Sequence, residues 1–236
     1  MLFRSEREHL IFDAEIFKDM VKQTSFAASV DESKGVLVGV LTEIHPQSVS
    51  MVALDGYRLA VSTEKMNSGQ ENHFIISAKI INEISKIIAE DGDAEEVEIY
   101  LGKKKATFRI DTTEIVLRLM EGEYIKYRDI MPTQSTTDIV IGRAILQESI
   151  ERASLLAREG KNNLIKMTIK NNLLTITSRS EEGNVKEEII MEKEGEDLEI
   201  GFNSKFVIDV LKVIDDDEIS MHFLTGTSPC MVKPVS

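Results

Sequence analysis

The sequence has little cysteine and few basic side chains. Its 236 residues include one cysteine, Cys230, which excludes an intrachain disulfide and is typical of proteins kept in a reducing compartment. Lys and Arg number 28 against 41 Asp and Glu, which gives a formal charge of −13. This balance excludes a broad basic surface that coats nucleic acid, because such surfaces bind by neutralising phosphates. Any contact with nucleic acid must therefore be local.

Long apolar runs are also missing. No run approaches the roughly 18 residues that a membrane span needs, and the start of the chain does not resemble a signal peptide. We therefore expect a cytoplasmic protein.

Residue patterns typical of enzymes and cofactor sites are absent from the sequence. The four histidines are scattered without metal-ligand spacing. The string GKKK (102–105) lacks the spacing of a phosphate-binding loop and fits a hairpin tip. The string DDDE (215–218) fits an acidic turn after a helix, since it lacks alternating calcium ligands. We expect a non-catalytic protein without cofactor or metal.

Two pairs of similar segments indicate an internal repeat. FIISAKIINEISKII (74–88) matches IGFNSKFVIDVLKVI (200–214) at an offset of 126, from Lys79 to Lys205. Each reads as an extended entry followed by an amphipathic helix. Segments 13–29 and 142–157 are also amphipathic and align at an offset of 129, from Glu15 to Ala144. Each half of the chain therefore predicts two helices.

Strand-like runs separate these helices in the same order in both halves. They are 35–44, 49–55, 57–63, 96–101, 105–111 and 114–120 in the first half, and 164–170, 173–179, 185–192, 197–202 and 218–226 in the second. Turn signals at hairpin spacing predict antiparallel sheets and hence an α+β fold. Pro132 and the polar run after it mark a boundary. The prediction is an unmatched leader over 1–8 and domains over 9–132 and 133–236.

A separate hairpin is predicted within the string VALDGYRLAVSTEK (52–65). Its Asp55-Gly56 pair lies between alternating runs and tolerates the positive φ of a type I′ turn. Taken alone, the string fits an ordinary surface hairpin, so the role of the residues after the turn has to come from the rest of the chain.

With these features in place, the chain resembles the bacterial sliding-clamp family, the beta subunit of DNA polymerase III. The string 52–65 is similar to the family's A-T-D-G-H/Y-R-L-A-V hairpin. Further similar strings are RASLLAREGKNN (152–163), VKEEI (185–189), IGFNSKF (200–206) and YRDIMP (127–132). The resemblance covers nearly everything after residue 8.

The resemblance implies the DNA clamp fold and its activity. Family members carry three similar domains, and two chains close head to tail into a ring around duplex DNA as a processivity factor. The halves of this chain resemble the middle and last domains. We expect a fragment that lacks the first domain and the end of the last one, and that does not close a ring. Read-through from an adapter or vector would explain the unmatched MLFRS at the start.

The resemblance also implies contact residues. A peptide from polymerases, the clamp loader or repair proteins would bind Leu37, Leu54, Gly56, Tyr57, Arg58, Leu59, Ile130, Asn203, Phe206, Ser228 and Cys230. Duplex DNA would face Lys18, Lys22, Lys79, Lys86, Arg143, Arg152, Lys205 and Lys212, without sequence readout. For each basic residue the alternative is an ordinary solvated helix face.

Three departures from the family bear on peptide preference. Leu54 stands where Thr is frequent, Ile125 where Pro is common and Asp129 where a basic residue can occur. Two other functions stay open. One is a clamp-fold interaction scaffold without a DNA role, which basic residues scattered away from the helices would favour. The other is a hydrolase built on the acidic clusters, which would need converging acids and a cleft.

Overall fold

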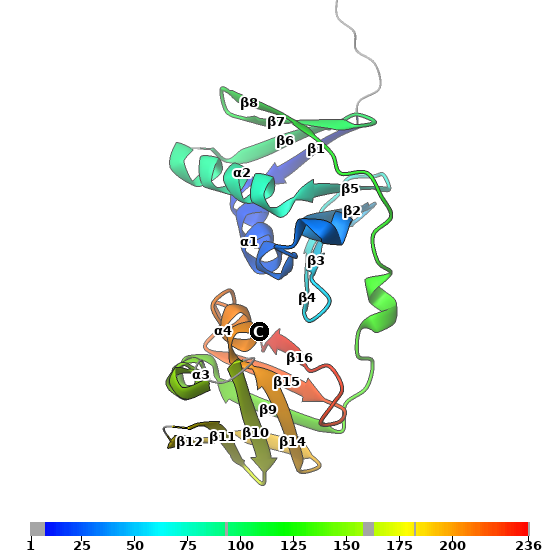
Figure 1. Cartoon of the computed structure of the whole chain (residues 1–236). Helices are drawn as coiled ribbons and strands as arrows, with labels where there is room; N and C mark the ends of the chain where they lie inside the picture. Colours follow the sequence, from blue (N-terminus) through cyan, green and yellow to red (C-terminus); the bar gives the residue numbers. More distant parts are fainter. Residues whose placement is uncertain (1–7, 93, 158–162, 182, 236) are drawn as a thin grey trace, which may run out of the picture. The chain divides into compact units, whose positions relative to one another are not determined.

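The computed structural model describes the chain except residues 1–7, 93, 158–162, 182 and 236. The chain divides into two compact units, Met1–Ile125 (unit 1) and Lys126–Ser236 (unit 2), shown in Figure 1. In the part of the chain that the structure describes, no helix is long and apolar enough to span a membrane.

Unit 1 combines two α-helices with two antiparallel four-stranded sheets among its described residues. The sheets have the strand orders β1-β6-β7-β8 and β4-β3-β2-β5. The elements are β1 (Glu8–Asp13), α1 (Ala14–Thr24), η1 (Ser25–Ala27), η2 (Glu32–Val38), β2 (Gly39–His45), β3 (Ser48–Leu54), β4 (Leu59–Lys65), β5 (Asn72–Ser77), α2 (Ala78–Asp91), β6 (Glu96–Leu101), β7 (Lys105–Ile110) and β8 (Thr113–Arg118).

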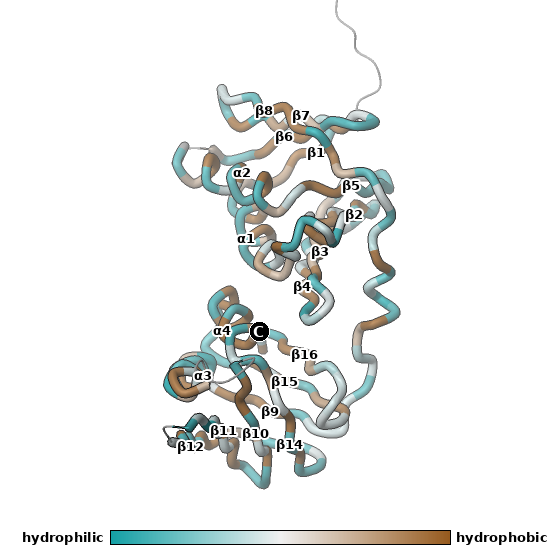
Figure 2. The backbone as a smooth tube through the Cα atoms, viewed as in Figure 1, coloured by the Kyte–Doolittle hydropathy of each residue, from teal (hydrophilic) through white to brown (hydrophobic). Residues whose placement is uncertain are grey.

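The helices of unit 1 follow from capping and periodicity. The Asp13 carboxylate accepts hydrogen bonds from the backbone N–H groups of Glu15 and Ile16 and so starts α1. In α2 the buried residues Ile81, Ile84 and Ile88 recur at helical spacing and join a core with both sheets. Figure 2 shows hydrophobic residues along the elements of each unit and hydrophilic ones at many of the turns.

Unit 2 repeats this plan in the residues that are described. Its sheets have the orders β13-β9-β15-β16 and β12-β11-β10-β14, again antiparallel. The elements are η3 (Tyr127–Ile130), β9 (Thr137–Gly142), α3 (Arg143–Ala157), β10 (Leu164–Lys170), β11 (Leu173–Ser180), β12 (Gly183–Ile190), β13 (Glu192–Gly195), β14 (Leu198–Asn203), α4 (Ser204–Leu211), β15 (Glu218–Phe223) and β16 (Met231–Pro234).

The repeat and the α+β class are confirmed. Segments 74–88 and 200–214 occupy equivalent places, because β5 leads into α2 as β14 leads into α4. Strand order β4-β3-β2-β5 corresponds to β12-β11-β10-β14, and α1 corresponds to α3. The units differ at β13, which continues the chain from β12 into the other sheet and pairs there with β9.

Several predicted strand boundaries are wrong. Residues 35–38 do not form a strand: Gly35 is a kink inside η2, with a non-helical φ of 59°, and residues 36–38 form a 3-10 turn after it. Strands β1 and β9, which lead into α1 and α3, were not among the predicted runs. The division between units falls after Ile125, before the predicted boundary at Pro132, and Glu8 of the predicted leader already belongs to β1.

The hairpin at 52–65 is confirmed, but its type I′ turn is wrong. Strands β3 and β4 pair from Leu54 with Leu59, so the loop holds the four residues 55–58. Only Gly56 of this loop has a positive φ, at 97°. The side chain of Asp55, described below, stabilises this longer loop.

Candidate functional site

The loop between β3 and β4 is organised by one carboxylate. Oδ1 of Asp55 accepts hydrogen bonds from the backbone N–H of Tyr57 at 2.8 Å and of Arg58 at 3.0 Å. Oδ2 accepts a hydrogen bond from Arg58 Nε at 3.1 Å. The backbone N–H of Asp55 donates to the Arg58 carbonyl at 3.3 Å. These contacts fix both ends of the loop to each other.

Arg58 lies folded against its own unit. Its guanidinium carbon is 5.4 Å from the centre of the Phe26 ring, a cation–π contact. The Arg58 side chain is 16% exposed and that of Asp55 13%, whereas Tyr57 is 81% exposed. The loop therefore presents an aromatic ring to solvent beside a half-buried cation. Sequence reasoning missed Phe26, because it lies far from Arg58 along the chain and matches no motif.

The predicted apolar residues of unit 1 differ in exposure. Leu54 is 2% exposed, so its side chain belongs to the interior, while Leu37 and Leu59 are half-buried. Leu59 pairs with Leu54 across the hairpin, and the Leu37 carbonyl accepts a hydrogen bond from the Ser29 N–H at 2.8 Å. Leu59 and Leu37 are the two of these three that can offer apolar surface to a ligand.

In unit 2 the predicted peptide contacts lie on three segments. Asn203 caps α4 by accepting a hydrogen bond from the Lys205 N–H, and half-buried Phe206 follows in the first helical turn. Ser228 shares a 2.7 Å hydrogen bond with Thr225 in the loop after β15. Ile130 ends η3 and is 54% exposed.

Cys230 packs against the core of unit 2. Burial raises the pKa of its thiol to about 12, so the side chain stays neutral at physiological pH. Because the thiolate is the reactive form of cysteine, this residue behaves as an apolar contact and not as a nucleophile.

Among the eight basic residues predicted to face DNA, Lys18, Lys79, Lys86 and Arg152 pair with acidic side chains of their own unit. Lys18 bonds Glu15 at 2.7 Å, Lys79 bonds Glu32 at 3.0 Å and Lys86 bonds Glu83 at 2.6 Å. Arg143 Nε donates to the Asp216 backbone carbonyl at 2.8 Å, and Arg152 bonds Glu187 at 2.8 Å. Lys22, Lys205 and Lys212 are exposed.

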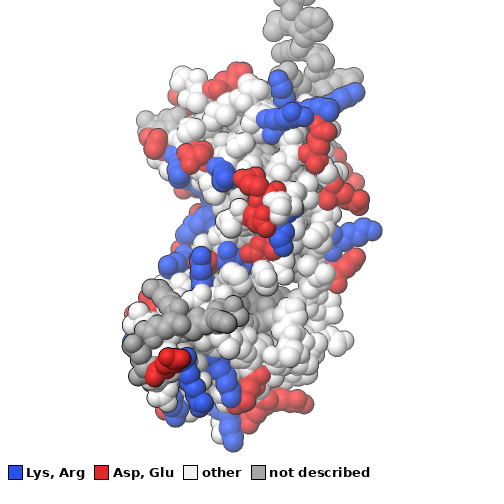
Figure 3. Space-filling view, in the orientation of Figure 1, with Lys and Arg blue, Asp and Glu red and all other residues white. Residues whose placement is uncertain are grey.

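Charge is distributed unevenly between the helices and the rest of the chain. Helices α1 to α4, with the C-cap Lys212, carry eight basic and eight acidic residues. The whole formal charge of −13 therefore lies outside them. Figure 3 shows acidic and basic atoms mixed over the visible face of each unit. The helices are the least acidic part of an acidic protein.

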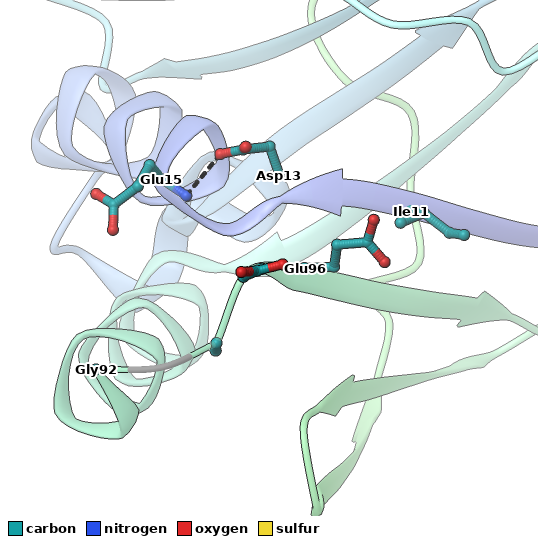
Figure 4. Close-up of a pocket in the computed structure, with 7 residues that line it drawn as sticks. Ile11, Asp13, Glu15, Gly92 and Glu96 are labelled. Atoms are coloured by element: carbon teal, nitrogen blue, oxygen red, sulfur yellow. Dashed lines mark hydrogen bonds between the residues drawn. The ribbon is translucent and has the colours of Figure 1, made fainter.

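An acidic recess of about 640 Å³ lies in unit 1 where α1 begins and α2 ends. Figure 4 shows Glu15 directed away from the carboxylate of Glu96, while Asp13 is engaged by the N–H of Glu15. The described residues include no group of three His, Cys, Asp or Glu side chains placed to hold a metal ion. The recess therefore offers no chelating arrangement.

A series of side-chain hydrogen bonds crosses the β13-β9-β15-β16 sheet of unit 2. His222 Nδ1 lies 2.7 Å from Asp138 and Nε2 lies 3.2 Å from the Ser220 hydroxyl. Asp138 and His222 are direct register partners on β9 and β15. Burial alone would raise the pKa of Asp138, but hydrogen bonds from Ser135 and His222 outweigh it and lower the pKa. Because Ser220 also approaches the Lys233 carbonyl at 3.4 Å, the series links three neighbouring strands.

Comparison with known proteins assigns both units to one family. Residues 12–126 match the central domain of the DNA polymerase III beta subunit, and residues 128–236 match its C-terminal domain. The beta sliding clamp of Staphylococcus epidermidis is 36% identical over 233 residues, 98% of this chain and 61% of that protein. The beta sliding clamp of Staphylococcus aureus is 34% identical over the same share of both chains.

Solved structures agree with the sequence matches. The DNA polymerase III beta subunit of Thermotoga maritima has a TM-score of 0.93 and 32% identity, and the match covers 100% of this chain and 64% of that one. The beta chain of Streptococcus pneumoniae has a TM-score of 0.93 and 30% identity, covering 100% of this chain and 63% of that one.

The fold is thus that of a repeated α+β clamp domain. The chain belongs to the DNA polymerase III beta subunit family, of which it carries the central and C-terminal domains. It spans 61% of the length of the curated relatives it matches. Of the similar strings, residues 158–162 of RASLLAREGKNN lie outside the described residues.

Proposed function

We propose that this chain serves as part of a DNA sliding clamp, a non-catalytic processivity factor that encircles duplex DNA and tethers the replicative polymerase during replication. The observation that carries the proposal is the match of both units, in order, to two successive domains of one family. The whole protein would act as a head-to-tail homodimer in the cytoplasm. Its partners would be DNA polymerase, the clamp loader and repair proteins.

The helices supply the proposed DNA contacts. With the C-cap Lys212, their equal numbers of acidic and basic residues avoid the repulsion that the rest of this acidic chain would exert on phosphates. Ion pairs such as Lys18–Glu15 and Lys86–Glu83 weaken the attraction of these lysines to DNA phosphates. Weak, water-mediated contacts suit sliding, because tight phosphate binding would fix the protein at one place.

Duplex binding at low salt tests this proposal. We expect Lys22→Ala, Lys86→Ala and Lys205→Ala each to weaken binding of a fluorescein-labelled duplex by about threefold and to flatten the salt dependence, because each removes a phosphate contact. Lys166→Ala is the matched control, since Lys166 lies on β10 and pairs with Glu199. Fluorescence anisotropy over a salt series measures both quantities.

If all four variants bind the duplex with the same affinity, the proposal that the helices contact DNA is wrong. That result would favour the second candidate, a clamp-fold scaffold that binds proteins alone. The helix ion pairs are the observation in its favour, because they neutralise cations that DNA would otherwise attract.

The peptide contacts proposed for unit 1 centre on the 55–58 loop. Half-buried Leu37 and Leu59 would hold aliphatic or aromatic anchors, and Arg58 would bind a carbonyl or carboxylate of the peptide. A Cβ at Gly56 would meet no atom within 4 Å, so the side with the exposed Gly56 backbone is open to a ligand. In unit 2 we propose that the peptide contacts Ile130, Asn203, Phe206, Ser228 and Cys230. Among them, Phe206 would supply the aromatic surface for an apolar side chain of the peptide.

Peptide titration tests these contacts. A short fluorescein-labelled peptide with Leu and Phe anchors should bind the chain, and Arg58→Ala or Leu59→Ala should each cost about 2 kcal/mol, roughly thirtyfold in affinity. Lys103→Ala, on the hairpin tip between β6 and β7, should change little. Equal affinities of wild type and both pocket variants would leave the hairpin as a surface turn without a binding role.

A further inference from the structure

The 55–58 loop depends on a residue outside the predicted contact set. Asp55 uses both carboxylate oxygens, Oδ1 for the backbone N–H groups of Tyr57 and Arg58 and Oδ2 for Arg58 Nε. We propose that Asp55 is the positioning residue of the peptide-binding loop, because these three bonds hold Tyr57 and Arg58 in one arrangement before a ligand arrives. This inference rests on the proposed peptide-binding function.

The geometry gives Asp55 control over both neighbouring side chains. A carboxylate bound to successive N–H groups fixes the backbone, so Tyr57 is directed to solvent and Arg58 returns over Phe26. The bond to Arg58 Nε is charge-assisted and only 13% of the Asp55 side chain is exposed, which limits competition from water.

The Gly56 backbone and the hydrogen bond that closes the 55–58 loop further restrict its conformation. Gly56 has a φ of 97°, which residues with a Cβ rarely adopt, and the Asp55 N–H donates to the Arg58 carbonyl. A loop of four residues that is fixed at its backbone, at one side chain and at its closing hydrogen bond loses little entropy on binding. Pre-organisation of this kind raises affinity without a new contact to the ligand.

Three substitutions separate positioning from charge. Asp55→Ala removes all three side-chain bonds. Asp55→Asn keeps an oxygen for the two backbone N–H groups but offers Arg58 Nε no acceptor. Asp55→Glu keeps the charge on a side chain too long for the same turn. With the labelled Leu and Phe peptide, we expect Asp55→Ala and Asp55→Glu to lose about tenfold or more in affinity. Asp55→Asn, which keeps the two backbone bonds and loses only the bond to Arg58 Nε, should lose about threefold.

A second readout needs no peptide. Amide hydrogen exchange measured by NMR should accelerate about tenfold at Tyr57 and Arg58 in Asp55→Glu and Asp55→Ala but little in Asp55→Asn, because the Oδ1 bonds protect these amides. Asp111→Asn is the matched control. It removes a carboxylate from the hairpin loop between β7 and β8 and should change neither readout.

The outcomes distinguish the two proposals. If wild type binds the peptide and Asp55→Glu binds as well as Asp55→Asn, positioning by Asp55 is overturned while peptide binding stands. If wild type binds no peptide, the proposed peptide function fails, and unchanged exchange at Tyr57 and Arg58 would overturn the positioning role as well. If Asp55→Ala does not fold, judged by circular dichroism, the comparison of Asn with Glu still decides.

Discussion

Thr42 illustrates how one side chain can work against the stability of its unit. It is fully buried on β2, between the core residues Val40 and Ile44 of the same strand face. Its hydroxyl has no hydrogen-bond partner among the described residues. Burying an unpaired hydroxyl costs free energy that the unfolded chain avoids, because there water solvates the group.

Thr42→Val should therefore stabilise the protein. The substitution keeps the branched shape and removes the unpaired hydroxyl, so we expect the free energy of unfolding to rise by about 1 kcal/mol. Thr42→Ser is the control: it keeps the hydroxyl and loses a buried methyl, and should destabilise. Urea unfolding followed by circular dichroism measures both. A less stable Thr42→Val would mean that the hydroxyl is hydrogen-bonded after all.

Residue-scale prediction from the sequence succeeded where local chemistry decides the outcome. Asp55 and Gly56 predicted a turn, and a turn is present, because Asp readily bonds nearby N–H groups and Gly tolerates positive φ. The four-residue loop and the Arg58 contact with Phe26 were not predictable, since they depend on which helix end packs beneath the hairpin.

At the scale of elements, Arg152 joins helix α3 to strand β12. Its guanidinium bonds the Glu187 carboxylate from Nη2 at 2.8 Å and from Nε at 3.2 Å. The hydrogen bond from Arg152 lowers the pKa of Glu187, more than burial raises it. A carboxylate whose pKa is lower in the folded state stabilises the fold above its unfolded pKa, and the contribution is lost as pH falls through the folded pKa.

Glu187→Gln should lower the melting temperature at neutral pH by a small amount, about 2 °C or less, because the pair is partly solvated. The difference from wild type should shrink as the pH falls below about 4, where the wild-type carboxylate also becomes neutral. Glu188→Gln is the control, since Glu188 pairs with Lys186 on the same strand and joins no second element. Thermal melts over a pH series give the comparison, and a pH-independent difference would argue against the ion pair.

The helices were easier to predict from the sequence than the beginnings and ends of the strands. The spacing of Ile81, Ile84 and Ile88 indicates a buried helix face without knowledge of any partner. Strand β13 could not be predicted, because its four residues continue an extended run and only the neighbouring strand decides which sheet they join. The strand predicted over residues 35–38 was wrong: their apolar pattern suits a strand, but they hold a kink at Gly35 and a short 3-10 turn after it.

At the scale of the whole molecule, the internal duplication explains why so much of the fold could be predicted from the sequence. Two copies of one pattern report the same fold twice, and each copy has its own core of buried residues. The residues proposed to contact peptide and DNA could not be predicted from periodicity. They entered through the family resemblance, since apolar loop residues and helix lysines look alike whether or not a ligand meets them.

Separate cores predict that the chain can be cut between its units without loss of either fold. The segment between β8 and β9 holds exposed Lys126 and Arg128, both substrates for trypsin, and only a short 3-10 turn of regular structure. Brief digestion should cleave there early and leave two fragments that keep native circular dichroism, because neither core crosses the cut. A Lys126→Gln and Arg128→Gln double variant should lose this early cut while its other sites are unchanged. Collapse of the circular dichroism signal as soon as the segment is cleaved would show that the two cores depend on each other for stability.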